Sequence, residues 1–90
     1  MLKIVPSNRF KRDLKQAVKR RLNLDLLNTV VTMLAEEKDL PPKYRDHELS
    51  GGYSGFRECH IQPDWLLIYR IEELELELYL FRTGTHSDLF

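Results

Sequence analysis

Three histidines are the side chains of this 90-residue sequence best suited to proton transfer near neutral pH. All of them lie in the second half of the chain, at His47, His60 and His86. A neighbouring carboxylate can orient an imidazole and stabilise its charged form. If residues 55–61 form a strand, Glu58 and His60 share one face of it, and Asp64 follows across a short turn. We therefore expect a cluster of carboxylates and imidazoles at one edge of a sheet.

Such a cluster has the groups that metal-free RNA cleavage requires. A base removes the proton of the ribose 2′-hydroxyl, an acid protonates the departing 5′-oxygen, and a cation stabilises the added negative charge. Arg57 and Arg82 could supply the cation. Each histidine also has a structural explanation: His47 as a solvated loop residue, His60 as a cross-strand packing residue, and His86 as a surface residue near the C-terminus.

Metal and nucleophilic chemistry fit the spacing less well. The sequence contains no His-x-His, no His-Glu-x-x-His and no pair of cysteines, so we predict no metal site. Cys59 lies on the opposite strand face from His60, which favours a small buried residue over a nucleophilic pair. Gly51 and Gly52 lack the lysine and helix of a phosphate-binding loop, so no small-molecule cofactor is expected.

The net charge of zero conceals an uneven distribution. Residues 1–21 hold eight basic side chains and one acidic one, a net charge of +7, and residues 22–90 carry −7. A basic block on one helix could bind a phosphate backbone, or it could simply be a solvated helix face. Composition alone does not separate these two interpretations.

The apolar spacing predicts the elements that must position the histidines. Strands are expected over 2–5, 55–61, 65–71 and 74–82, with helices over 9–21 and from Asn23 or Asp25 to about Lys38. Residues 39–55 are predicted to be a long irregular loop. The resulting order, β-α-α-β-β-β, predicts an α+β fold in which a two-helix hairpin packs on one face of a small, mainly antiparallel sheet.

Two strands have patterns that predict their environment. Residues 65–71 are almost wholly apolar, which predicts a central strand. From Leu74 to Leu80 leucines alternate with other residues, which predicts one face in the core and one in solvent. Glu72 and Glu73 would form the connection between these strands.

Length and composition predict a single domain, residues 1–90. The sequence has no apolar run long enough for a membrane span or a secretory signal, so we expect a cytoplasmic protein with no membrane partner. Most aromatic residues are expected in the core. Phe90 is the exception, because a C-terminal aromatic residue has few reasons to be buried and could lie across a ligand.

Three segments of the second half resemble the YafQ branch of the RelE/ParE toxin superfamily. They are YRDHEL at 44–49, GFRECHIQPDWLLIY at 55–69 and FRTGTHSDLF at 81–90. The chain length and the predicted order of elements also match a RelE-like fold. The resemblance implies a bacterial type II toxin that is silenced by a cognate antitoxin protein, enters the ribosomal A site and cleaves mRNA there.

By position, the resemblance implies four catalytic residues: His47, His60, Asp64 and His86. We expect His86 to be the general acid, His60 or His47 the base, and Asp64 the group that orients an imidazole. The resemblance also implies RNA contacts by a further set of residues: Glu58, Trp65, Arg82 and Phe90. Arg82 would stabilise the phosphorane, and Phe90 would lie near the substrate. Glu58 departs from the family pattern, in which we expect aspartate.

The basic helix has a use in this interpretation. The end of the helix, Lys19, Arg20 and Arg21, is predicted to contact ribosomal RNA phosphates. Two alternatives remain within the same fold. One is a ParE-like toxin that poisons DNA gyrase by binding and cleaves nothing, and the other is a ribosome-independent RNase.

Overall fold

The computed structural model describes all residues, 1–90, and is built on a five-stranded mixed sheet of order β1-β5-β4-β3-β2. Its elements in chain order are β1 (Lys3–Pro6), α1 (Asn8–Lys19), α2 (Leu24–Ala35), η1 (Pro42–Tyr44), β2 (His47–Glu48), η2 (Gly51–Tyr53), β3 (Arg57–Gln62), β4 (Trp65–Glu72), β5 (Glu77–Gly84) and α3 (His86–Leu89). Only β1 and β5 pair in parallel. The predicted α+β fold with a mainly antiparallel sheet is confirmed.

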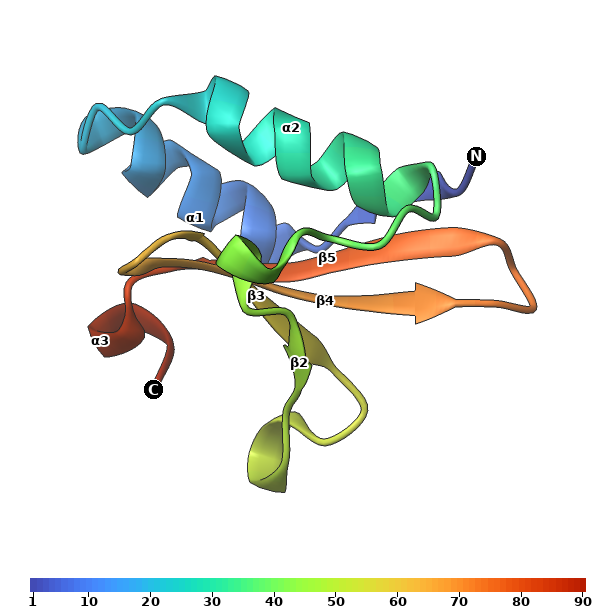
Figure 1. The fold of residues 1–90 in the computed structure, drawn as a ribbon. Helices are drawn as coiled ribbons and strands as arrows, with labels where there is room; N and C mark the ends of the chain where they lie inside the picture. The colour runs from blue at the N-terminus through green and yellow to red at the C-terminus, as the bar shows by residue number, and fades with distance from the viewer.

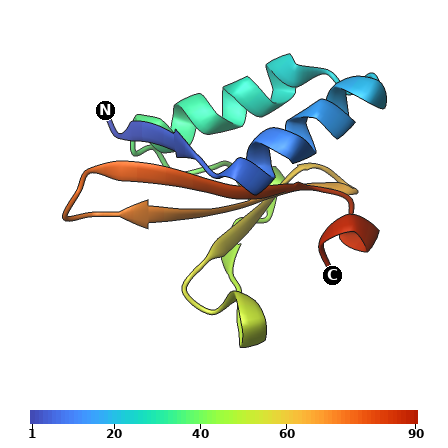
Figure 2. The same ribbon diagram turned by 180° about the vertical axis from the view of Figure 1, so that it is seen from behind.

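Helices α1 and α2 lie side by side on one face of the sheet (Figures 1 and 2). Each begins at a capping side chain: Ser7 Oγ accepts the N–H of Phe10 at 2.9 Å, and Asn23 Oδ1 accepts that of Asp25 at 3.0 Å. Such a cap is worth about 1 kcal/mol. Of the two residues considered for the second cap, Asn23 is the one used.

The core lies between these helices and the central strands. Buried α2 side chains pack with Leu67, Tyr69 and Leu78 in one cluster. A smaller cluster, centred on Leu66 and Ile68, lies on the opposite face of the sheet. Strand β4 is thus apolar on both faces, as predicted for a central strand. The second face carries α3, β2 and η2 but no long helix (Figure 2).

The predicted strand over 74–82 is wrong in its first three residues. Strand β4 continues to Glu72, residues 73–76 form a turn, and β5 begins at Glu77. Leu74 and Leu76 are therefore 96% and 63% exposed instead of lying in the core. The alternation of leucine and glutamate continues through a turn, where it carries no information about burial.

The long loop and the C-terminus hold structure that periodicity did not predict. Residues 39–55 contain η1, η2 and the two-residue strand β2, which pairs His47 with Glu58 of β3. After β5 the chain turns into α3, which begins at His86. No helix of the chain has the length and apolar character needed to cross a bilayer.

Candidate active site

The catalytic candidates gather on the sheet face opposite α1 and α2. Cys59 is fully buried in the core on the helix side, so its neighbours Glu58 and His60 on β3 point to the other face. Antiparallel pairing brings His47 of β2 opposite Glu58. The β3–β4 turn and α3 add Asp64 and His86 to the same edge. The predicted cluster of carboxylates and imidazoles is present.

Glu58 lies between two imidazoles. Its Oε1 is 3.6 Å from His47 Nε2 and 3.4 Å from His60 Nε2, and its side chain is only 5% exposed. The Nδ1 atoms face backbone carbonyls, at 2.7 Å from Arg45 O and 3.3 Å from Pro63 O. Because a carbonyl only accepts, these contacts assign a hydrogen to each Nδ1. Each Nε2 can therefore take up a proton beside a carboxylate that stabilises the resulting cation.

His86 is held by Asp64. Asp64 Oδ1 accepts the backbone N–H of His86 at 2.9 Å and its Nδ1–H at 2.6 Å. These two hydrogen bonds, backbone first, hold the pKa of the Asp64 carboxyl below its usual range. With Nδ1 bonded to the carboxylate, Nε2 is the ring nitrogen that is left to exchange a proton with another group. This arrangement suits a general acid.

The three imidazoles form a row. The ring centroids of His47 and His60 are 6.3 Å apart, and those of His60 and His86 are 5.6 Å apart. Glu58 lies between the first two rings of the row, and Asp64 contacts the third. Groups that can accept and donate a proton therefore lie on neighbouring rings.

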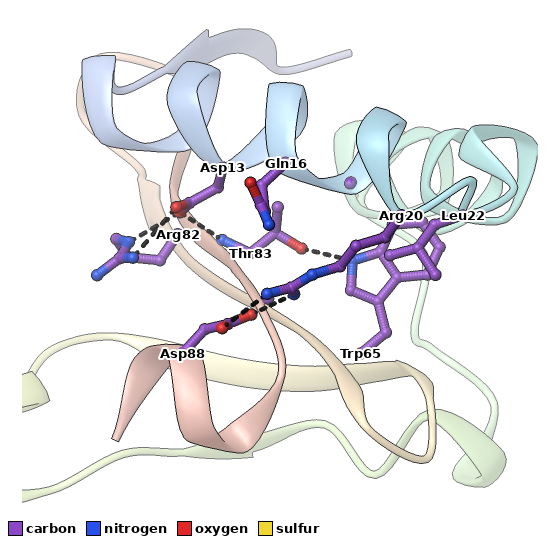
Figure 3. A pocket seen from close by; sticks show the side chains of 10 residues that line it. Asp13, Gln16, Arg20, Leu22, Trp65, Arg82, Thr83 and Asp88 are labelled. Carbon is purple, nitrogen blue, oxygen red and sulfur yellow. Dashed lines mark hydrogen bonds and ion pairs between the residues drawn. The ribbon is translucent and has the colours of Figure 1, made fainter.

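Arg82 is tied to α1. Its Nε and Nη2 donate to the two oxygens of Asp13 at 2.8 and 3.1 Å, and Asp13 also accepts the N–H of Thr83 (Figure 3). The bond to Asp13 raises the pKa of the guanidinium, against its partial burial. Only Nη1 has no protein partner, so a phosphate contact by Arg82 would use that nitrogen.

Phe90 is 63% exposed, and its ring lies edge-on to Tyr53 with centroids 5.2 Å apart. The Tyr53 hydroxyl donates to the carbonyl of Leu89 at 2.8 Å, which fixes the end of the chain against η2. An exposed aromatic ring four residues after His86 is available for stacking on a base. Tyr53 was not identified from the sequence, because nothing in its own segment links it to the C-terminus.

Two predicted RNA contacts need correction. Trp65 is 2% exposed, and its indole N–H donates at 2.9 Å to the Thr83 hydroxyl (Figure 3). No base can stack on a ring buried in the core below α1. Glu58 is buried as well, and the side chains next to its carboxylate are those of His47 and His60, so it is not placed for a direct RNA contact.

The basic residues at the end of α1 differ in their surroundings. Lys19 and Arg21 are exposed and form no ion pair, whereas Arg20 pairs with Asp88 of α3. Asp88 and α3 were missed in the sequence, although Thr85-x-x-Asp88 is the pattern of a capping box and could have indicated a helix. Arg57, considered as a cation for the site, instead pairs with Asp46.

Three side chains also converge as possible metal ligands. The donor atoms of His47, Glu58 and His60 all lie within 4.8 Å of one another. The spacing of these residues gave no indication of this, because it is strand pairing that brings His47 to β3. Two imidazole nitrogens and a carboxylate, with both Nδ1–H groups donated to carbonyls, form a donor set suited to a transition metal.

Comparison with known proteins identifies the family of this chain. The family described as "Bacterial toxin of type II toxin-antitoxin system, YafQ" matches residues 2–90. The mRNA interferase toxin YafQ of Escherichia coli K12 is 39% identical over 85 residues, which cover 93% of this chain and 90% of the relative.

Two solved structures superpose on the whole chain. A metal-bound toxin from Helicobacter pylori is 52% identical, covers 100% of both chains and gives a TM-score of 0.94. YafQ in the E. coli DinJ-YafQ complex is 37% identical, covers 100% of this chain and 99% of its own, and gives a TM-score of 0.89. The resemblance seen in the sequence is confirmed: this chain belongs to the YafQ family of bacterial type II toxin-antitoxin toxins.

Proposed function

We propose that this toxin is an mRNA interferase, an endoribonuclease that cleaves mRNA in the ribosomal A site without a metal cofactor. The observation that supports it most is the row of three imidazoles, with Glu58 between two of them and Asp64 against the third. A toxin that acts only by binding has no need for such an arrangement. The name of the E. coli relative, mRNA interferase, supports the same activity.

The reaction follows from the positions of the nitrogen atoms. Nε2 of His47 or His60 takes the proton of the ribose 2′-hydroxyl, and Glu58 stabilises the imidazolium that forms. The 2′-oxygen bonds to phosphorus, the bond from phosphorus to the 5′-oxygen breaks, and His86 Nε2 gives its proton to that oxygen. The products are a 2′,3′-cyclic phosphate and a 5′-hydroxyl. Arg82 Nη1 stabilises the phosphorane between these steps.

Purified translation reactions test this activity. Mapping mRNA ends with a chelator present, with and without ribosomes, compares the wild type with His86→Gln. We expect cuts within the A-site codon that require both the ribosome and His86. Cuts without ribosomes would indicate a ribosome-independent RNase. No cuts from folded protein would favour gyrase poisoning, which a supercoiling assay detects.

The ribosome contact is proposed to involve the end of α1. Lys19 and Arg21 are exposed and unpaired, so they can neutralise ribosomal RNA phosphates. Replacing both with glutamine should weaken ribosome binding and flatten its dependence on salt. Binding that is unchanged across a salt series would exclude this surface. With a ribosomal target, the proposed location of the toxin is the cytoplasm.

A protein antitoxin is the second expected partner, because the related E. coli toxin has been solved in a complex with DinJ. The exposed basic residues of α1 favour an acidic segment of that antitoxin. Coexpression of the cognate pair, followed by purification at increasing salt, tests this. A complex that resists high salt would show that charge is not the main contribution to its stability.

A second candidate function is metal binding by His47, Glu58 and His60. The convergence of their donor atoms and the metal-bound H. pylori relative support it. Such an ion would bind the same Nε2 lone pairs that accept protons, so it would inhibit cleavage instead of assisting it. Calorimetric titration of Zn²⁺ into wild type and Glu58→Gln should show binding that is weaker in the variant. Equal binding by both proteins would place the metal elsewhere.

A further inference from the structure

Asp88 of α3 joins three parts of the molecule. Its oxygens accept Arg20 Nη1 at 2.5 Å and Nη2 at 3.0 Å (Figure 3). Oδ2 also accepts the backbone N–H of Thr85 at 2.9 Å. Thr85 Oγ1 in turn accepts the N–H of Asp88 at 3.1 Å, which completes a capping box. A single carboxylate therefore fixes the first turn of α3 and binds that turn to α1.

The backbone before α3 is shaped to allow this. A Cβ on Gly84 would lie 2.8 Å from Asp88 Oδ2 and 3.0 Å from Asp88 Cβ. Only a residue without a side chain lets Asp88 fold back beneath the end of β5. A side chain at position 84 would therefore displace Asp88. The substitution Gly84→Ala thus disturbs the position of Asp88 without changing its charge.

His86 lies inside this arrangement, as the first residue of α3. Asp64 holds its ring and its backbone N–H from the β3–β4 turn, while the capping box and Arg20 hold the helix from the other side. A helix of four residues has no stability of its own, so its position depends on these contacts. The orientation of the imidazole depends on them in turn.

Helix α1 is a firm support for this contact. Asp13 anchors it to β5 by bonds to Arg82 and to the backbone N–H of Thr83, and Phe10 and Ala17 are buried against the core. Arg20, the C-cap residue of α1, therefore extends from the end of an anchored helix. Its neighbours Lys19 and Arg21 have no such partner.

We propose that Arg20 is a positioning residue for the general acid His86, and that it acts through Asp88. The proposal rests on the proposed ribonuclease activity and refines it, since it takes Arg20 out of the group of ribosomal RNA contacts. The residues at the end of α1 then have two different functions. Lys19 and Arg21 bind phosphate, while Arg20 keeps α3 in the place where His86 reaches the leaving oxygen.

The test compares Arg20→Met and Arg20→Lys with Arg12→Met, which removes one exposed charge from the same helix. The first readout is the NMR spectrum of the His86 ring nitrogens in the free protein. The second readout is single-turnover cleavage over a series of ribosome concentrations. It gives two quantities, the rate at saturating ribosomes and the ribosome concentration at half of that rate. A dispersed backbone spectrum confirms that each variant is folded.

We expect Arg20→Met to shift the His86 resonances and to lower the saturating rate by about tenfold, in line with the cost of misplacing a reacting group. Its half-saturation concentration should change no more than that of Arg12→Met. Arg20→Lys should retain part of the rate, because a lysine keeps the charge but not the two-nitrogen contact. Gly84→Ala should resemble Arg20→Met in both readouts.

Two results would overturn the proposal. In one, Arg20→Met weakens ribosome binding but leaves the His86 spectrum and the saturating rate at wild-type values, which makes Arg20 an RNA contact only. In the other, the spectrum changes and the rate does not. A wild type that cleaves no RNA would instead refute the proposed function, and the spectra would still report whether Arg20 positions His86.

Discussion

One oxygen of Asp64 accepts both hydrogen bonds that fix His86, the backbone N–H at 2.9 Å and Nδ1–H at 2.6 Å. The carboxylate therefore fixes both the position of the residue and the orientation of its ring, with Nδ1 toward Asp64 and Nε2 left without a bond to it.

Asp64→Asn keeps an acceptor oxygen but removes the charge that stabilises the imidazolium. We expect single-turnover cleavage to fall by about 10- to 100-fold at saturating ribosomes, with little change in ribosome affinity. Asp39→Asn, which neutralises an exposed carboxylate without ion pairs, is the control. Equal rates for the two variants would show that Asp64 has no part in the reaction.

Glu58→Gln removes the buried charge between His47 and His60. We expect cleavage to fall by about 10²-fold, because neither Nε2 then has an anion beside it when it takes up a proton. Glu58→Asp keeps the charge and restores the residue expected in the family, so it should retain most of the activity. Glu48→Gln, on the adjacent strand with an 83% exposed side chain, should cleave like the wild type.

Stability at acid pH should depend on Asp88 and, to a smaller extent, on Asp64. The pKa of both carboxyls lies below the usual 3.8, for Asp88 mainly because of the bond from Arg20 and for Asp64 because of the bonds from His86. Their contribution to stability is complete above about pH 4 and is lost as the pH falls through the lowered values.

Urea unfolding between pH 7 and pH 2.5 measures this contribution. Asp88→Asn should lower the free energy of unfolding at neutral pH. When the pH is then lowered below 4, the free energy of unfolding should decrease less for the variant than for the wild type. Parallel curves for variant and wild type over the acid range would rule out the assignment. Asp39→Asn again provides the matched loss of one carboxylate.

Trp65→Phe should act on stability and not on RNA binding. The change leaves the Thr83 hydroxyl without its buried indole donor, which costs about 1–3 kcal/mol in the free energy of unfolding. Urea denaturation followed by circular dichroism measures this, and ribosome binding should be unchanged. If the variant is as stable as the wild type but binds ribosomes more weakly, the correction is wrong and Trp65 contacts RNA.

The sequence predicted the fold well wherever local periodicity is coupled to burial. The helix over α1, the start of α2 at Asn23 or Asp25 and the apolar central strand β4 all follow from patterns within one segment. Leu74 and Leu76 show the limit, because the same alternation runs on into a turn. Periodicity describes a strand only while the backbone stays extended.

The sequence predicted which residues form the candidate site, but it did not predict the contacts between them. Glu58 and His60 were placed on one face because they share a strand, whereas His47 reaches them only through the pairing of β2 with β3. Likewise, the partners Arg20 and Asp88 are 68 residues apart in sequence. Contacts between distant segments leave no trace in a single sequence, so these roles required the structure.

The parallel pairing of β1 with β5 has a consequence for how the toxin is made. Residues 3–6 bond to residues 77–80, and the Ser7 hydroxyl at the start of α1 donates to the carbonyl of Phe81. β1 therefore cannot pair within the sheet until β5, the last strand in chain order, has been synthesised.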